Sequence, residues 1–158
     1  MNARLNLFGN KAAATFLKHI NSAGKVVTDS GLPHATQELV KIRASQINGC
    51  GFCTDMHTKD ATEAGETALR LNLIAVWREA TVFTDAERAA LELAEAMTAT
   101  PPNVTDELFA RLQQFYDEPQ LVELVSIIAQ ENFRARRNTT FRIPSAGSYC
   151  PLPPPASA

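Results

Sequence analysis

Apolar residues recur at helical spacing along most of this 158-residue chain. No segment alternates apolar and polar side chains with period two over a convincing length, as a half-buried strand would. Glycine and proline separate the apolar segments and mark where helices begin and end. The sequence therefore predicts an all-α fold with about seven helices, the second, third and seventh near the centre. The expected helices span residues 10–28, 34–48, 51–64, 67–80, 84–98, 105–116 and 119–137.

Composition indicates one ordinary globular domain. Hydrophobic residues make up 45% of the chain and charged residues 20%, which is typical of such domains. The last sixteen residues differ, because they hold five of the nine prolines. We therefore expect a helical domain over residues 1–142 and an extended, proline-rich tail over residues 143–158.

Charge and hydropathy exclude several classes of protein. The net charge of −2 gives no electrostatic basis for binding nucleic acid or an anionic membrane. The amino terminus lacks a signal-peptide apolar core, and no apolar run has the length of a membrane span. We therefore expect a cytoplasmic protein, in which thiols stay reduced. Three cysteines cannot all pair, and we interpret Cys150, in the tail, as incidental or as a contact thiol.

Two cysteines and a histidine form the chemical centre of the sequence. Cys50 and Cys53 are three residues apart, and His57 follows four residues later. Asn48-Gly49 is a turn signal, so the cysteines fall in the first turn of a new helix, where the helix dipole stabilises a thiolate. Cys53 and His57 lie about 40° apart on one face, so the imidazole can exchange a proton with the thiol.

Glu38 lies within the broad apolar face of the preceding helix. A buried carboxylate needs a partner. We therefore expect Glu38 either to pair with a cation such as Arg43 or to have a chemical role beside the dithiol. Asp60 could orient the ring of His57, although a surface charge is the commoner role for such a residue. Phe52, Met56 and Trp77 could line an apolar pocket, or simply pack in the core.

Four interpretations of this motif compete. A redox-active dithiol fits best. Two thiolates, an imidazole and Glu38 could instead hold zinc, but a helical Cys-x-x-Cys matches common structural zinc sites poorly, so we expect no metal and no cofactor. Haem attachment needs histidine directly after the second cysteine, where Thr54 stands. The cysteines could also only pack. A thioredoxin is excluded, because the chain lacks strands around the pair.

The pattern Glu38-x11-Cys50-x2-Cys53-x3-His57 resembles the core motif of AhpD-like alkylhydroperoxidases, in the carboxymuconolactone decarboxylase superfamily. The similarity is strongest over residues 38–65 and extends over about residues 5–142. It implies an AhpD-like helical bundle, a homo-oligomer (often a trimer or hexamer) and thiol peroxidase activity.

The resemblance also implies roles for the four residues. Cys53 would be the peroxidatic thiol and Cys50 the proton donor and resolving thiol, while Glu38 and His57 would form a proton relay. Physical reasoning alone leaves the order of the cysteines open, because the helix end favours Cys50 and the imidazole favours Cys53. The implied partners are a peroxide substrate and a dithiol or lipoyl-type electron donor. The alternatives are a carboxymuconolactone decarboxylase-type enzyme and a non-catalytic redox-sensing dithiol protein.

Overall fold

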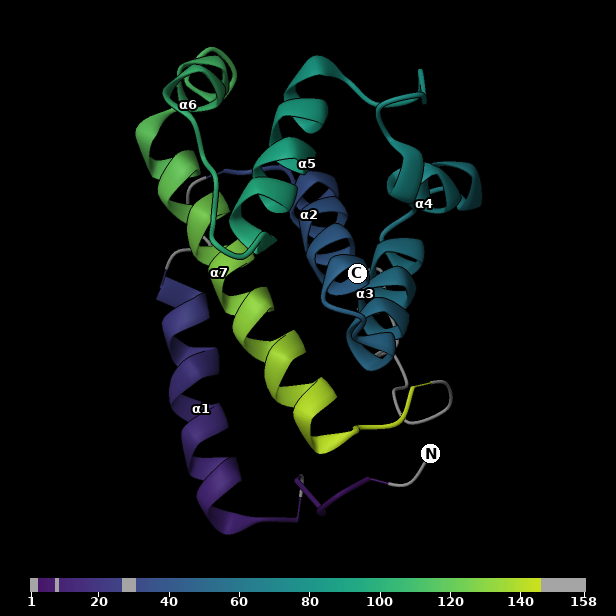
Figure 1. Ribbon diagram of the computed structural model, residues 1–158, viewed down its shortest axis with the longest axis vertical. Helices are drawn as coiled ribbons and strands as arrows, with labels where there is room; N and C mark the ends of the chain where they lie inside the picture. The colour runs from purple at the N-terminus through teal and green to yellow at the C-terminus, as the bar shows by residue number, and fades with distance from the viewer. Residues whose placement is uncertain (1–2, 8, 27–30, 146–158) are drawn as a thin grey trace, which may run out of the picture.

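The computed structural model describes residues 3–7, 9–26 and 31–145, and within them it confirms the all-α prediction, with seven α-helices, one short 3₁₀ helix and no strand. Figure 1 shows their arrangement. The elements are α1 (Lys11–Val26), α2 (His34–Ile47), α3 (Gly51–Glu63), α4 (Ala68–Leu73), η1 (Ile74–Val76), α5 (Asp85–Thr98), α6 (Asp106–Leu112) and α7 (Glu118–Phe141).

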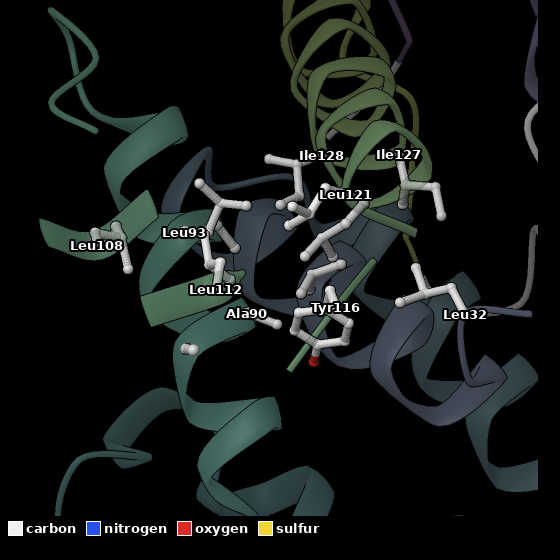
Figure 2. Close-up of a cluster of buried hydrophobic side chains, with 13 residues drawn as sticks. Leu32, Ala90, Leu93, Leu108, Leu112, Tyr116, Leu121, Ile127 and Ile128 are labelled. Carbon is white, nitrogen blue, oxygen red and sulfur yellow. The ribbon is translucent and has the colours of Figure 1, made fainter. Parts of the chain in front are cut away.

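Helix α2 is the centre of the bundle. It packs against α3, α5 and α7, as the breadth of its apolar face predicted, while α1 lies alongside α7 (Figure 1). The largest buried cluster fills the space between α2, α5, α6 and α7, and Figure 2 shows many of its side chains. A second cluster packs α2 against the segment from α4 to α5, around Trp77 and Leu91. Both clusters pack against α2, which carries Glu38.

Two helix starts follow from capping residues in the sequence. Thr84 caps α5 and exchanges hydrogen bonds with Glu87 in a capping box. Asp117 does the same for α7 with Gln120, and Pro119 lies within the first turn, where a missing N–H costs nothing. Helix α7 is longer than expected and ends at Phe141. The last turn of α7 matters because it carries a residue that contacts the sulfur of Cys53.

The predicted helix over residues 67–80 is wrong in its second half. Helix α4 ends at Leu73, and only the 3₁₀ turn η1 follows. The guanidinium of Arg88 donates hydrogen bonds to the carbonyl oxygens of Trp77, Arg78 and Ala80 at 2.9–3.0 Å. Because a side chain distant in sequence satisfies these carbonyls, the backbone leaves the helix without losing partners.

The predicted helix over residues 105–116 is also too long, since α6 ends at Leu112. The chain turns there and brings Tyr116 into the main cluster, where its hydroxyl donates to the Ala86 carbonyl at 2.9 Å. The end expected at residue 28 and the tail with Cys150 lie outside the described residues, except that residues 143–145 are non-helical. Among the helices of the described ranges, none is both long and apolar enough to cross a membrane.

Candidate active site

The turn between α2 and α3 places the cysteines at a helix start. Gly49 has φ +66°, a conformation that glycine adopts without strain, and it ends α2 as the Asn48-Gly49 signal predicted. Cys50 is the N-cap residue of α3, and its Sγ accepts a hydrogen bond from the backbone N–H of Cys53 at 3.2 Å. The pair therefore lies against the positive end of the α3 dipole.

The structure joins Cys50 and Cys53 in a disulfide, with Cα atoms 5.4 Å apart. Both residues are almost fully buried, in a small cluster with Phe52 and Ala135. Met56 and Ile143 pack against this cluster. The predicted pairing of the two cysteines is thus present, and Cys50 and Cys53 are close enough to exchange between dithiol and disulfide with little backbone movement.

His57 lies between two carboxylates, one from each neighbouring helix. Its Nδ1 is 2.9 Å from Oε2 of Glu38 on α2, and its Nε2 is 3.1 Å from Oε2 of Glu131 on α7. All three side chains are buried. The structure therefore brings Glu38 and His57 together, and the proton relay that they would form stays a prediction. Because both ring nitrogens face carboxylates, direct proton exchange between His57 and Cys53 stays a prediction.

Two further groups complete the hydrogen bonding of this ionic cluster. Lys41 Nζ donates to Oε1 of Glu38 at 2.8 Å. Ser45 Oγ lies 2.7 Å from Oε1 of Glu131 and also 2.7 Å from the Lys41 carbonyl oxygen. With His57 protonated, two positive and two negative charges balance, so burial leaves no charge unpaired.

The cluster shifts the acidity of its members. Burial alone would lower the pKa of His57, but its hydrogen bonds to Glu131 and Glu38 and their negative charges outweigh burial and raise this pKa to about 9. Burial alone would raise the pKa of Glu38, but the hydrogen bond from His57 and the charge of Lys41 outweigh it and hold this pKa at about 2. At neutral pH His57 is therefore an imidazolium that donates from both nitrogens.

Asn138, on the last turns of α7, contacts the disulfide directly. Its Nδ2 lies 3.3 Å from Sγ of Cys53, and its side chain is buried. Its Oδ1 accepts two hydrogen bonds from Arg137, from Nη2 at 2.9 Å and from Nε at 3.2 Å. The sulfur of Cys53 thus faces the N–H donor of Asn138, and the guanidinium of Arg137 binds the oxygen of the same amide.

Three separate surface cavities reach this site. A cavity of about 330 Å³ opens beside Cys50 and is lined by Phe52, Asn138 and the segment 142–145. A second, of about 320 Å³, reaches Glu38, and a third, of about 310 Å³, reaches Glu131 and Lys41. The first gives a small molecule access to the disulfide at Cys50. The other two bring solvent to the ends of the ionic cluster, where protons can enter or leave.

Several residues singled out in the sequence have other partners in the structure. Arg43 does not accompany Glu38, because it donates to Glu95 at 2.8 Å instead. Glu95 also accepts a hydrogen bond from Trp77 Nε1 at 2.9 Å. Trp77 packs in the second core cluster and does not belong to the cysteine cluster. Phe52 and Met56 do lie in or against the cysteine cluster.

Asp60 lies close to the ionic cluster. One carboxylate oxygen of Asp60 lies within 4.8 Å of ligand atoms of Glu38 and His57, so the three residue types could hold a metal ion. However, both nitrogens of His57 and both carboxylate oxygens of Glu38 already form hydrogen bonds at 2.8–3.1 Å. This geometry suits a proton-holding cluster better than a cation site.

Sequence reasoning missed Glu131 and Asn138. Both lie on the face of α7 that also carries Leu124, Ile128 and Ala135, at helical spacings of three and four residues. Two polar residues that continue a buried apolar stripe are the signal that could have identified them. Their partners His57 and Cys53 lie 74 and 85 residues away in the sequence, so the sequence does not indicate which residues they meet.

A known family matches the segment of the chain that carries this site. The model of the carboxymuconolactone decarboxylase family matches residues 12–96, which is more than half of the chain. The chain belongs to the carboxymuconolactone decarboxylase family. The match includes α2 and α3, and therefore Glu38, both cysteines and His57.

Relatives of this chain include an uncharacterized protein and an alkyl hydroperoxide reductase. The uncharacterized protein YdfG of Bacillus subtilis is 48% identical over 109 residues, covering 68% of this chain and 74% of YdfG. The alkyl hydroperoxide reductase AhpD of Rhodopseudomonas palustris is 32% identical over 96 residues, covering 57% of this chain and 51% of that protein.

Solved structures confirm the AhpD-like fold. ATU0492 of Agrobacterium tumefaciens, a protein of unknown function provisionally linked to antioxidant defence and AhpD, superposes with a TM-score of 0.84 at 34% identity. The match covers 92% of this chain and 99% of ATU0492. The debrominase Bmp8 superposes with a TM-score of 0.77 at 21% identity, over 89% of this chain and 75% of Bmp8, and shows the fold alone.

Proposed function

We propose that this protein is a thiol-dependent peroxidase that reduces alkyl hydroperoxides through Cys50 and Cys53. The observation that carries the proposal is the buried Cys50–Cys53 disulfide at the start of α3, with a cavity beside Cys50 and an N–H donor on Cys53. The AhpD-like fold and the alkyl hydroperoxide reductase among its relatives support the same reaction class.

The proposed reaction uses the cysteines in a fixed order. The Cys53 thiolate attacks the distal oxygen of the peroxide, the O–O bond breaks, and Cys53 becomes a sulfenic acid while the alkoxide takes a proton and leaves as an alcohol. The Cys50 thiol then attacks the Cys53 sulfur, and water leaves as the disulfide forms. A dithiol donor reduces the disulfide and is itself oxidised to a disulfide, which closes the cycle.

We assign the proton transfers to the ionic cluster. His57 carries a proton at neutral pH, and Glu38 holds its Nδ1. Protons can reach the cluster from the cavities at Glu38 and Glu131. The cluster would supply the proton that the departing alkoxide needs, and Glu38 and Glu131 would stabilise the imidazolium of His57 before the transfer.

The proposal includes the partners. A dithiol or lipoyl-type donor fits a cavity that exposes Cys50 but is too small for a folded domain. A reducing cytoplasm would regenerate such a donor. We also propose a homo-oligomer, a trimer or hexamer, because apolar side chains on α4 and α7 stay exposed in the single chain.

Peroxide consumption with cumene hydroperoxide and dihydrolipoamide tests the proposal. Cys53→Ser should abolish both turnover and the trapping of a sulfenic acid. Cys50→Ser should abolish turnover but leave a trappable sulfenic acid on Cys53. Glu38→Gln and His57→Gln should keep the fold and slow turnover by about 10²-fold. Cys150→Ser is the matched control and should react like the parent protein.

Other outcomes would replace the proposal. Trapping that persists in Cys53→Ser and is lost in Cys50→Ser would reverse the order of the two cysteines. A parent protein that cycles between dithiol and disulfide without consuming peroxide would be a redox sensor. Activity on a carboxymuconolactone that survives loss of both cysteines would indicate the decarboxylase-type reaction.

A further inference from the structure

Asn138 offers its amide N–H to one sulfur of the disulfide. Nδ2 lies 3.3 Å from Cys53 Sγ, within hydrogen-bonding distance for sulfur, and the Asn138 residue is only 5% exposed. Water therefore competes poorly for this donor. Cys50 has a different donor, the backbone N–H of Cys53 at 3.2 Å. Each sulfur thus has its own N–H donor, and only that of Cys53 comes from a replaceable side chain.

The orientation of this amide is fixed by the residue before it. Arg137 donates two hydrogen bonds to Oδ1, from Nη2 at 2.9 Å and from Nε at 3.2 Å. A guanidinium has no acceptor, so a flipped amide would set N–H groups against N–H groups. Arg137 therefore keeps the NH₂ group of Asn138 toward Cys53, and its positive charge polarises the amide and strengthens it as a donor.

This arrangement favours the thiolate form of Cys53. A disulfide sulfur is a weak acceptor, whereas a thiolate is a charged one, and a hydrogen bond to the charged form of a group stabilises that form. We propose that Asn138 is a catalytic residue that stabilises the Cys53 thiolate, and that Arg137 is the positioning residue that orients it. This inference rests on the proposed function in taking Cys53 as the sulfur that reacts with peroxide.

The same contact gives reduction a direction. The cavity beside the disulfide is lined by Cys50 but not by Cys53. A donor thiolate entering there would attack Cys50 Sγ, the S–S bond would break, and its electron pair would go to Cys53, whose thiolate Asn138 already faces. The second donor thiol would then displace Cys50 from the mixed disulfide. Thiol–disulfide exchange is faster when the leaving thiol has a lower pKa.

Charged groups around the pair come from every neighbouring element. They are Glu38 and Lys41 on α2, His57 and Asp60 on α3, Glu131 and Arg137 on α7, and Arg142 after α7. Burial and nearby Arg134 lower the pKa of Arg137, which still leaves its guanidinium charged. The variants must therefore separate the Asn138 contact from the effect of general charge.

Thiol titration in single-cysteine backgrounds is the test. In Cys50→Ser, Cys150→Ser protein, ultraviolet absorbance of the thiolate reports Cys53 alone. Asn138→Leu should raise the pKa of Cys53 by about one to two, the loss expected for one hydrogen bond to a charged group. Asn138→Asp, which keeps the side-chain volume, should raise it at least as far, because it removes the donor and adds a negative charge.

The Cys53→Ser, Cys150→Ser background is the control for location, since Asn138→Leu should leave the pKa of Cys50 unchanged there. Arg137→Gln should raise the pKa of Cys53 by less than Asn138→Leu does, and Arg137→Lys should restore part of the difference. Arg136→Gln removes the same charge from an exposed neighbour on α7 and should leave the pKa of Cys53 unchanged.

A Cys53 pKa that stays constant in both Asn138 variants would overturn the inference, as would an equal rise from Arg136→Gln and Arg137→Gln. If Asn138→Leu does not fold, Asn138→Ala takes its place, because it removes the donor without adding a charge. The readout needs no peroxide turnover. A parent protein that consumes no peroxide but shows these shifts would refute the proposed function and keep the thiolate contact. A parent protein that consumes peroxide but shows no shift in the Asn138 variants would keep the proposed function and refute the role of Asn138.

Discussion

At the scale of the residue, the main feature of this site is one imidazolium between two buried carboxylates. Glu38 and Glu131 approach opposite nitrogens of His57, and Lys41 also bonds to Glu38. The positive charges of His57 and Lys41 thus balance the two carboxylates. An imidazole bound on one side only would change its charge near neutral pH. Because carboxylates bind both nitrogens of His57, its pKa is raised to about 9. His57 is therefore protonated throughout the physiological pH range.

The shifted pKa values of His57 and Glu38 should make the free energy of unfolding depend on pH. His57 titrates near 9 when folded and near 6.5 when unfolded, so its contribution is complete below pH 6.5 and is lost as the pH rises through 9. Glu38 titrates near 2 when folded and 4.5 when unfolded, so its contribution is complete above pH 4.5 and is lost as the pH falls toward 2. The free energy of unfolding should therefore be greatest between pH 4.5 and 6.5.

Glu131→Gln tests this account by urea unfolding across pH. It should lower the pKa of His57, reduce the alkaline loss of stability and destabilise the protein at pH 6 by about 1–3 kcal/mol, because it removes a buried hydrogen bond between charged groups. Glu92→Gln, which breaks an exposed pair with Arg111, is the control and should cost at most about 1 kcal/mol. An unchanged pH profile in Glu131→Gln would contradict the charge assignment.

The sequence could predict the half of this site that is local. Glu38, Cys50, Cys53 and His57 fall within twenty residues, so helical spacing was enough to bring them together. Glu131 and Asn138 come from α7, and only the packing of α7 against α2 and α3 brings them to the site. Helical periodicity defines the face of α7 on which they lie, but it contains no information on the register between helices.

At the scale of the element, the start of α3 has both a structural and a chemical role. Cys50 is the N-cap residue, so its sulfur takes the place of the hydroxyl or carboxylate oxygen that usually accepts there. Helix α4 shows the opposite situation, in which local sequence misled. Its apolar spacing continues past Leu73, but Arg88 on α5 satisfies the carbonyls of a non-helical backbone, and a contact of that kind is invisible in a window of residues.

The capping role of Cys50 predicts a difference between two substitutions that remove the same thiol. In the reduced protein, Cys50→Ser keeps an N-cap acceptor, whereas Cys50→Ala leaves the Cys53 N–H without one. Cys50→Ala should therefore be less stable than Cys50→Ser by about 0.5–2 kcal/mol in denaturant unfolding. Equal stability of the two variants would show that the sulfur contributes nothing as a cap. Cys150→Ser compared with Cys150→Ala controls for the general effect of the hydroxyl.

At the scale of the whole molecule, apolar side chains remain on the surface after the core is complete. Helix α2 hides most of its apolar side chains against α3, α5 and α7. Leu69 and Val76, on α4 and η1, are 60% and 52% exposed. Val122 on α7 is 53% exposed and lines a surface depression of about 630 Å³ together with Phe109. These exposed groups support assembly through α4 and through α6 with α7.

Light scattering at micromolar concentration should give a mass several times that of one chain. Val122→Glu should shift the protein toward smaller species, because a carboxylate within an apolar contact loses its hydration without gaining a partner. Val104→Glu makes the same change at a site that is 41% exposed, in the segment before α6, and should leave the mass unchanged. If both variants dissociate equally, charge repulsion explains the effect, and the depression at Val122 is not an interface. A monomeric parent protein would mean that the exposed apolar groups on α4 and α7 serve no assembly, and the complete site would then lie within one chain.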